Sequence, residues 1–447
     1  MTTLTVDFGS TFTKGALIAD DGAVLATGAT PTTGTLGRGD ILDGYRRLRA
    51  ELDVPADARV RACSSAGGGL RLAVVGYERT VTAEAGHRVG LSAGAKVVHV
   101  AAGELSTAGV NGIRAARPDI VLLVGGTDGG NSNVLLHNAA RLANAAIGGH
   151  GTHAVPVVVA GNVDVRHEAV ARLEVTQRPT LVAANVLPRI GVIAPESARA
   201  TIREAFLRHV IGGKGLSRDG AFATMVEAAT PDAVLSGVEL LAEEMDGDVL
   251  VVDVGGATTD VYSCITPEGE DAGLRKDVVA PLWHARTVEG DLGVRWNALG
   301  VIEAARAELL WPPGGEAGDE IDAYAAHVHE QPTSLPRDAD EQGLDLELAR
   351  LAALVAVRRH ARAAQPTESP RPLANVTTLM GSGGVLRFAD QVGRDRVLGA
   401  VLADHAGGWK VPREARASVD APYLLFAVGL LADSDPALAR ALAAQIL

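Results

Sequence analysis

The chain has 447 residues, a formal net charge of -13 at pH 7, and 47% hydrophobic residues. This length is too great for one ordinary compact core and predicts two lobes or domains. The acidic balance and the lack of a long Lys/Arg block argue against nucleic-acid binding, because contacts to the phosphate backbone need a basic stripe. No segment offers the roughly 20 uninterrupted apolar residues of a membrane helix, and the N-terminus does not resemble a signal peptide. We therefore expect a soluble cytoplasmic protein without nucleic-acid or membrane partners.

The chain contains two cysteines, Cys63 and Cys264. They are too few and too far apart in sequence for a disulfide framework, a zinc ribbon or a cysteine-ligated iron–sulfur cluster. Their apolar neighbours predict two ordinary buried thiols in a reducing compartment.

The expected elements begin with short strands that end in glycine-rich turns. Asp21-Gly22 predicts a hairpin turn between the second and third of them. From about residue 80 to 210, apolar strands alternate with helices, which predicts parallel βαβ units. A Pro-, Gly- and acid-rich stretch at 312–345 predicts an exposed segment that includes His327 and His329. The expected strands are 4–6, 14–18, 23–26, 59–63, 96–100, 120–124, 155–160, 249–254 and 376–380, and the expected helices are 41–52, 133–146, 344–364 and 422–447.

Three glycine-rich loops carry the functional hypothesis. The first, residues 5–14, reads TVDFGSTFTK; the second, residues 251–260, reads VVDVGGATTD; the third, residues 379–386, reads LMGSGGVL. Asp7 and Asp253 each end an apolar strand, and Mg²⁺ prefers few carboxylates together with water and substrate phosphates. One of these carboxylates would also orient an attacking water molecule. The expected nucleotide-binding residues are Gly9, Ser10, Thr11, Thr13, Lys14, Gly255, Gly256, Thr258, Thr259, Gly381, Ser382, Gly383 and Gly384.

The order of the three loops resembles the phosphate 1, phosphate 2 and adenosine motifs of the actin, Hsp70 and sugar-kinase superfamily. Two competing nucleotide-binding motifs are missing. The sequence GGKG at 212–215 lacks the hydroxyl residue that a phosphate loop needs after its lysine. No GxGxxG follows the first strand, so a dinucleotide-binding fold has no support there. The loops therefore predict ATP and Mg²⁺ as ligands, with Asp7 and Asp253 as catalytic and metal-binding residues.

Beyond the loops, the chain resembles the MutL-type glutamate mutase accessory family. The matching strings are DFGSTFTK, CSSAGGGLRLAVVG, VGGTDGGN, VVVAGN, NVLPRIGVI, VDVGGATTD and VEGDLG, which span nearly the whole chain. The resemblance implies a two-lobed, actin-like (ribonuclease-H-like) α/β fold with parallel-rich mixed sheets and an inserted α/β region. It also implies an ATPase that reactivates an adenosylcobalamin-dependent mutase, with the mutase subunits as partners. A homodimer is compatible with the sequence, which does not fix the oligomeric state or name the client.

The fold implied by the resemblance predicts a division of the chain at about residues 80 and 245. Residues 1–80 would begin the N-terminal lobe, 81–245 would form the inserted region, and 246–447 would form the C-terminal lobe, with terminal helices that return to the first lobe. Gly429 in these helices would permit close helix packing at the crossing between the lobes.

Several residues keep two interpretations. Asp128 and Asn131 in VGGTDGGN form a second ligand site or partner surface, approach the nucleotide, or make a tight turn that caps the helix from Asn133. Arg189 serves either a phosphate or partner, or a structural salt bridge. Glu289 and Asp291 either reach the metal or lie in a solvated loop.

The shared loops also fit a small-molecule kinase or a non-hydrolysing nucleotide-dependent scaffold. A kinase would normally need a catalytic Asp placed for the substrate hydroxyl, and the sequence does not identify one.

Overall fold

The computed structural model divides into two compact units. Unit 1 comprises Met1–Ala66, Ala233–Thr266 and Arg286–Leu447, and unit 2 comprises Gly67–Asp232 and Pro267–Ala285. The structure describes residues 2–34, 39–66, 70–78, 81–93, 95–211, 216–217, 221–245, 247–265, 284–310, 316–362, 371–405 and 411–446. The GGKG string at 212–215 lies outside these described residues.

The first sheet of unit 1 is built on an antiparallel hairpin. β1 pairs antiparallel with β2, β2 pairs antiparallel with β3, and β4 lies parallel to β1 on its other side. The β1 side chains Leu4, Val6 and Phe8 are fully buried because they alternate toward the core. A turn at residues 19–23 joins β2 to β3, which confirms the predicted hairpin. The bounds are β1 Thr2–Phe8, β2 Phe12–Ala19, β3 Val24–Pro31, α1 Ile41–Glu51 and β4 Arg59–Ser64.

The second sheet of unit 1 repeats this plan. Its strand order is β13-β12-β11-β14-β15, and β11 pairs antiparallel with β12 and parallel with β14. Each sheet of unit 1 thus carries an antiparallel hairpin whose first strand has a parallel neighbour. The bounds are β11 Val249–Val254, β12 Thr259–Cys264, β13 His284–Glu289, β14 Thr378–Ser382 and β15 Arg416–Val419.

Two helices of unit 1 cross at unusually close range. A Cβ placed on Gly429 of α14 would lie 1.7 Å from the carbonyl oxygen of Ala233 in α8, and one on Gly237 would lie 2.2 Å from that of Leu425. Only glycine allows two backbones to approach this closely, so the predicted role of Gly429 in helix packing is confirmed. The helices of this unit are α8 Thr230–Met245, α9 Ala298–Ala307, α10 Glu316–Glu330, α11 Ala339–Ala361, α12 Gly384–Phe388, α13 Gln391–Leu402, α14 Leu425–Ala432 and α15 Pro436–Ala443.

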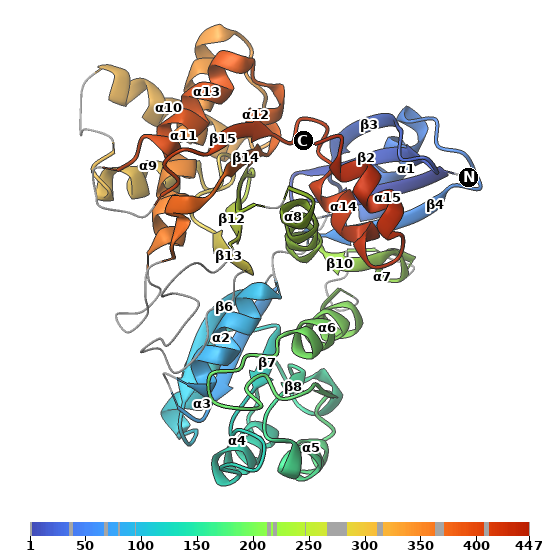
Figure 1. The fold of residues 1–447 in the computed structure, drawn as a ribbon, viewed down its shortest axis with the longest axis vertical. Coiled ribbons are helices and arrows are strands. Elements are labelled where there is room, and N and C mark those ends of the chain that lie inside the picture. The colour runs from blue at the N-terminus through green and yellow to red at the C-terminus, as the bar shows by residue number, and fades with distance from the viewer. Residues whose placement is uncertain are drawn as a thin grey trace. The chain divides into compact units, whose positions relative to one another are not determined.

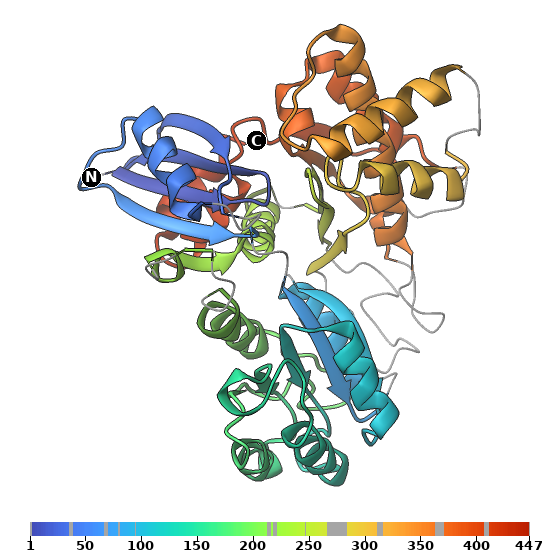
Figure 2. The ribbon, with the colours of Figure 1, turned by 180° about the vertical axis from the view of Figure 1, so that it is seen from behind.

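Unit 2 contains a parallel sheet with helices on both faces (Figures 1 and 2). Its strand order is β6-β5-β7-β8-β9, and all four pairings are parallel. α3, α4 and α5 share one buried apolar cluster with one face, while glycines of α2 pack on the other. The prediction of parallel βαβ units is confirmed. The bounds are β5 Arg71–Gly76, α2 Thr82–Ser92, β6 Lys96–Ala102, α3 Thr107–Ala116, β7 Ile120–Leu123, α4 Asn133–Ala143, β8 Val157–Val159, α5 Arg166–Glu174, β9 Thr180–Val182, α6 Glu196–Ala205, α7 Ala221–Met225 and β10 Val226–Ala229.

The expected exposed segment at 312–345 was wrong. Residues 316–330 form α10, and α11 already begins at Ala339. Ile321, Tyr324, Ala325 and Val328 are buried at helical spacing, because the segment turns an apolar face toward α9 and α11. The Pro residues that suggested a loop lie outside α10 and α11, whereas Gly318 and Gly343 are accommodated within these helices.

The order of strands and helices and the three mixed or parallel sheets confirm the predicted α/β class. Two sheets of ribonuclease-H-like plan, each with a parallel strand beside an antiparallel hairpin, share one unit with closely crossing helices. None of the helices in the described ranges combines the length and apolar character needed to cross a membrane.

Candidate functional site

The first loop is a tight turn that only glycine can close. Asp7 stands opposite Lys14 in the β1–β2 pairing, and the N–H of Gly9 donates to the carbonyl of Phe12 at 3.2 Å. A Cβ on Gly9 would lie 2.7 Å from that carbonyl oxygen. The turn therefore forces the chain back immediately after the strand and leaves Asp7 at the strand end.

The second loop has the same backbone. Asp253 stands opposite Asp260 in the β11–β12 pairing, and the N–H of Gly255 donates to the carbonyl of Thr258 at 2.9 Å. A Cβ on Gly255 would again lie 2.7 Å from the carbonyl oxygen it faces. Asp7 and Asp253 thus occupy equivalent positions in two equivalent turns.

Trp296 joins the two loops. Its indole Nε1 donates to Thr11 Oγ1 of the first loop at 3.1 Å, and its backbone N–H donates to the carbonyl of Gly256 in the second loop at 2.9 Å. A Cβ on Gly256 would lie 3.0 Å from Thr11 Oγ1, so the two turns are close neighbours. Trp296 is not among the residues predicted from the sequence, where its only signal is a position shortly after the VEGDLG string.

The Asp7 carboxylate is buried and well partnered. Its side chain is 1% exposed, Tyr423 Oη donates to Oδ2 at 2.9 Å, and Lys14 Nζ lies 3.6 Å from the same oxygen. Cys63 Sγ approaches Oδ1 at 3.8 Å. Such partners are what a buried carboxylate requires. Tyr423 was also missed from sequence, because it comes from a turn more than 400 residues away along the chain.

Asp253 has a different electrostatic environment. Burial raises its pKa from 3.8 to about 6, Lys14 opposes this rise, and the carboxylates of Asp260 and Asp7 add to it. The residue as a whole is half-buried. A carboxylate with a raised pKa beside other carboxylates is typical of sites that bind a cation.

The third loop lies beside the second. Ser382 ends β14 in register with Asp253 of β11, so Gly381 and Ser382 belong to the strand. Gly383 has φ +98°, and a Cβ there would lie 2.1 Å from the carbonyl oxygen of Val254. Gly384 is exposed and begins the short helix α12. The structure therefore brings the second and third loops together.

Two predicted hydroxyls are already engaged in the fold. Thr13 Oγ1 lies 3.0 Å from Thr32 Oγ1, and Thr259 Oγ1 donates to the carbonyl of Leu292 at 2.7 Å; both side chains are fully buried. Because both hydroxyls are buried and bonded, they support the turn, and the expected nucleotide contact of Thr13 and Thr259 stays a prediction. Ser10, Thr11 and Thr258 are half-buried, and the Ser10 and Thr258 hydroxyls also donate within the protein, to the carbonyl of Ser65 at 3.2 Å and to Asp260 Oδ2 at 3.1 Å.

Glu289 and Asp291 pair with an arginine of α11. Arg359 Nη1 lies 2.8 Å from Glu289 Oε2 and 2.8 Å from Asp291 Oδ1, and its Nη2 donates to Asp291 Oδ2 at 2.9 Å. Burial raises the pKa of Glu289, and the Arg359 guanidinium opposes this rise. Glu289 ends β13 and is not in a loop, whereas Asp291 lies exposed in the following turn, as the solvated-loop interpretation expects.

In unit 2, the VGGTDGGN turn is a junction of three loops. Asp128 Oδ1 accepts from Asn185 Nδ2 at 2.8 Å and from the N–H of Val163 at 3.2 Å. Asn131 Oδ1 accepts from the N–H of Val134 at 3.4 Å, which is a loose cap of α4. The capping interpretation therefore holds for Asn131 and not for Asp128. Arg189 is exposed and forms no ion pair within the described residues, so the expected salt bridge is absent there.

The remaining candidates have plain structural explanations. Neither Cys63 nor Cys264 forms a disulfide; Cys63 is buried as predicted, whereas Cys264 is half-buried, contrary to the prediction, and burial raises its pKa to about 12. The contact between Cys63 and Asp7 corrects the expectation of purely apolar surroundings. His327 and His329 lie on α10, and His329 Nδ1 is 2.8 Å from the carbonyl oxygen of Trp296.

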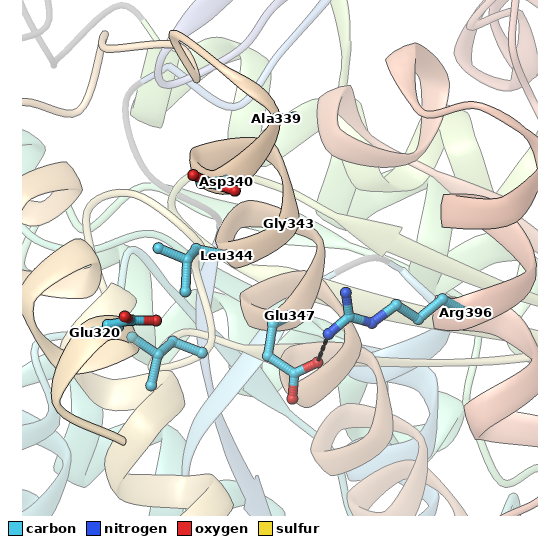
Figure 3. A pocket seen from close by; sticks show the side chains of 8 residues that line it. Glu320, Ala339, Asp340, Gly343, Leu344, Glu347 and Arg396 are labelled. Carbon is cyan, nitrogen blue, oxygen red and sulfur yellow. Dashed lines mark hydrogen bonds and ion pairs between the residues drawn. The ribbon is translucent and has the colours of Figure 1, made fainter. Parts of the chain in front are cut away.

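A separate hollow of about 550 Å³ lies among α10, α11 and α13 (Figure 3). Glu347 and Arg396 face each other in it at 2.7 Å, and Arg350 also binds Glu347. None of the predicted site residues lines this hollow, and its buried carboxylate is satisfied by arginines. Across the described ranges, no three His, Cys, Asp or Glu side chains gather as a metal-binding cluster.

Comparison with known proteins identifies a family that matches almost the whole chain. A family model described as MutL protein matches residues 3–447. Protein MutL of Clostridium tetanomorphum is 34% identical over 455 residues, covering 97% of this chain and 96% of its own length.

Similarity to solved structures is weak. The ethanolamine utilization protein EutJ from Carboxydothermus hydrogenoformans aligns with a TM-score of 0.31 at 11% identity, over 99% of this chain and 89% of its own. The activator of 2-hydroxyisocaproyl-CoA dehydratase from Clostridium difficile, solved with bound ADPNP, aligns with a TM-score of 0.29 at 11% identity, over 100% and 97%. TM-scores of this size do not define a shared fold, whereas the family match spans almost the whole chain.

Proposed function

Because the chain belongs to the MutL family, we propose that it is an ATP-dependent reactivating chaperone for an adenosylcobalamin-dependent mutase similar to glutamate mutase. ATP binding and hydrolysis in unit 1 would drive the exchange of damaged cobalamin on the mutase for intact coenzyme. One observation carries the nucleotide part of this proposal: two matching Asp-x-Gly turns lie side by side, joined through Trp296.

The residues present suit ATP with Mg²⁺. Asp7 and Asp253 supply two carboxylates at equivalent strand ends, and Mg²⁺ binds to one or two carboxylates together with water and phosphate oxygens. The raised pKa of Asp253 indicates negative charge that a cation would relieve. Glycine turns with nearby hydroxyls, such as those at Gly9 and Gly255, let backbone N–H groups approach phosphate oxygens.

In this proposal each residue has a limited task. Asp7 and Asp253 would hold Mg²⁺, which when bound neutralises phosphate charge. Ser10, Thr11 and Thr258 would donate hydrogen bonds to phosphate oxygens, and Lys14 would add a positive charge. Gly383 and Gly384 would lie against the nucleoside. One of the two carboxylates, Asp7 or Asp253, would also orient the attacking water.

A reactivation assay tests the chaperone role. The assay starts from inactive glutamate mutase that carries damaged cobalamin. Its activity is measured after addition of this protein, free adenosylcobalamin and Mg-ATP. We expect recovery with ATP and none with ADP. Recovery no better than in the control without this protein would contradict the chaperone role.

Two further outcomes separate the competing functions. ATP turnover that appears only when a small metabolite is added would indicate a kinase. ATP binding without phosphate release, even with the mutase present, would indicate a scaffold that does not hydrolyse nucleotide. A chaperone predicts slow ATP hydrolysis without any added acceptor.

A further inference from the structure

Tyr423 holds a strained position next to the candidate site. Its φ is +60°, in the left-handed region that non-glycine residues rarely adopt, and it lies two residues before α14 begins. Asp420 fixes the turn, because its two carboxylate oxygens accept from the N–H groups of Leu424 at 2.8 Å and Leu425 at 3.0 Å. Strain that the surrounding structure enforces in this way is concentrated at functional sites.

The strained turn places the Tyr423 hydroxyl between two charged groups. It donates to Asp7 Oδ2 at 2.9 Å and accepts from Lys14 Nζ at 2.8 Å. The two charges are themselves only 3.6 Å apart. The tyrosine hydroxyl therefore satisfies both an anion and a cation of the first loop, and it fixes the orientation of each.

The ring is fixed as firmly as the hydroxyl. Tyr423 is 6% exposed, and its ring packs against Phe426 with 5.3 Å between ring centroids. The guanidinium carbon of Arg387, which follows the third loop, lies 4.9 Å from the ring centroid. Tyr423 thus contacts the first loop and a residue next to the third, and α14 behind it is locked against α8 by the Gly429 contact.

The second loop has no counterpart of this arrangement in the described residues. Asp260 stands where the first loop has Lys14, and its partners are Thr258 and Arg286. Among the residues that the structure describes, a tyrosine from a distant turn fixes the Asp7 side of the site, and the Asp253 side shows no equivalent tyrosine contact.

We propose that Tyr423 is a positioning residue for the magnesium–nucleotide site, which holds the Asp7 carboxylate in its metal-binding orientation. This inference rests on the proposed function, since it assigns a residue to the same site. It predicts that loss of the hydroxyl alone impairs metal-dependent nucleotide binding, even though Tyr423 contacts the metal site only through Asp7 and Lys14.

The experiment compares Tyr423→Phe with Tyr45→Phe by calorimetric titration of ATP, with Mg²⁺ and with EDTA. Tyr45 is a matched control: it is 7% exposed, its ring lies 6.0 Å from that of Phe8, and its hydroxyl accepts from Arg49. We expect Tyr423→Phe to weaken Mg-ATP binding about ten-fold, as loss of a hydrogen bond to a charged group would. Metal-free ATP binding should change less than two-fold, and Tyr45→Phe should match the wild type in both titrations.

A second background separates positioning from general packing. In Asp7→Asn protein, the added Tyr423→Phe change should alter nucleotide affinity less than two-fold, because the group that it positions has been removed. An equal ten-fold loss in both backgrounds would overturn the proposal.

The outcomes also distinguish this inference from the proposed function. Wild-type protein that binds Mg-ATP and a Tyr423→Phe variant that binds it equally well would overturn the positioning role alone. Wild-type protein that binds no nucleotide would overturn the proposed function and, with it, the role of Tyr423.

Discussion

The two Asp-x-Gly loops of unit 1 have the same backbone and different chemistry. Each places an aspartate at a strand end, closes on a glycine N–H to the carbonyl three residues later, and leaves no room for a Cβ. Yet Asp7 faces Lys14 across its hairpin, whereas Asp253 faces Asp260. The parallel neighbour of Asp7 is Cys63, and that of Asp253 is Ser382. The comparison shows that glycine and sterics determine the turn, while the flanking side chains determine its charge.

Among the substitutions that distinguish the two loops, Asp260→Ala should have the largest effect on stability. Asp260 Oδ1 accepts from Arg286 at 3.0 Å, and the Arg286 side chain is 2% exposed. Removal of the carboxylate that faces a buried guanidinium should lower the free energy of unfolding by about 3 kcal/mol in urea denaturation. The matched control is Asp322→Ala, whose partner Arg306 is 37% exposed.

We expect the control to cost less than about 1 kcal/mol, because exposed ion pairs contribute little. Equal losses of stability in Asp260→Ala and Asp322→Ala would contradict the claim that the Asp260–Arg286 ion pair stabilises the second loop.

The shared backbone predicts equal effects at the two glycines. Gly9→Ala and Gly255→Ala each bring a Cβ to 2.7 Å from a backbone carbonyl oxygen. The carbonyl cannot move without opening the turn, so each change should destabilise the protein by about 2 kcal/mol. This loss is measured as a shift of the urea unfolding midpoint with an unchanged dependence of the free energy on urea concentration. Gly343→Ala is the control, since no atom lies within 4 Å of its Cβ position in α11, and it should be neutral or stabilising. Unequal losses at Gly9 and Gly255 would contradict the equivalence of the loops.

The two aspartates should respond in opposite directions to substitution by asparagine. Asp253 has a pKa of about 6 in the folded, metal-free protein and near 3.8 when unfolded, so ionisation at neutral pH destabilises the fold. Asp253→Asn should therefore stabilise metal-free protein by about 1–2 kcal/mol at pH 8, after allowance for solvent screening. Asp7→Asn should destabilise metal-free protein by a similar amount, because Tyr423 and Lys14 lose the carboxylate that they share.

The stability gain of Asp253→Asn should depend on pH in a defined direction. The stability that its protonated form contributes is fully present below pH 3.8 and is lost as pH rises through about 6. The advantage of Asp253→Asn should therefore be largest above pH 6 and shrink toward pH 4. An advantage that did not change between pH 4 and pH 8 would contradict the burial of this carboxylate.

Local sequence patterns were sufficient for many of the strands and for the glycine turns, but not for β5, β9, β10, β12, β13 and β15. The close helix crossing at Gly429 was predicted from the resemblance to the superfamily and not from a local pattern. Asp7, Gly9, Asp253 and Gly255 could be found because a strand that ends in Asp-x-Gly has a local signature. The helix at Glu316–Glu330 had such a signature too, in its buried positions at helical spacing, but proline and glycine at its ends outweighed it.

Long-range partners could not be predicted in this way. Tyr423 meets Asp7 and Trp296 meets Thr11 only because the fold brings distant segments together. Nothing in the sequence around Tyr423 indicates a left-handed backbone, since this conformation is imposed by the capping of α14 by Asp420. Likewise, the engagement of the Thr13 and Thr259 hydroxyls depends on neighbours that a single strand does not reveal.

Magnesium-dependent ATP hydrolysis by Asp7→Ala and Asp253→Ala tests the central claim most directly, with Asp322→Ala as the control and thermal unfolding as the check on folding. If the two loops form one magnesium–nucleotide site, each of the first two variants should remain folded and lose hydrolysis at least a hundred-fold, about 2.7 kcal/mol in barrier height. The control should hydrolyse ATP at the wild-type rate. Normal magnesium-dependent hydrolysis in both Asp7→Ala and Asp253→Ala would contradict the account.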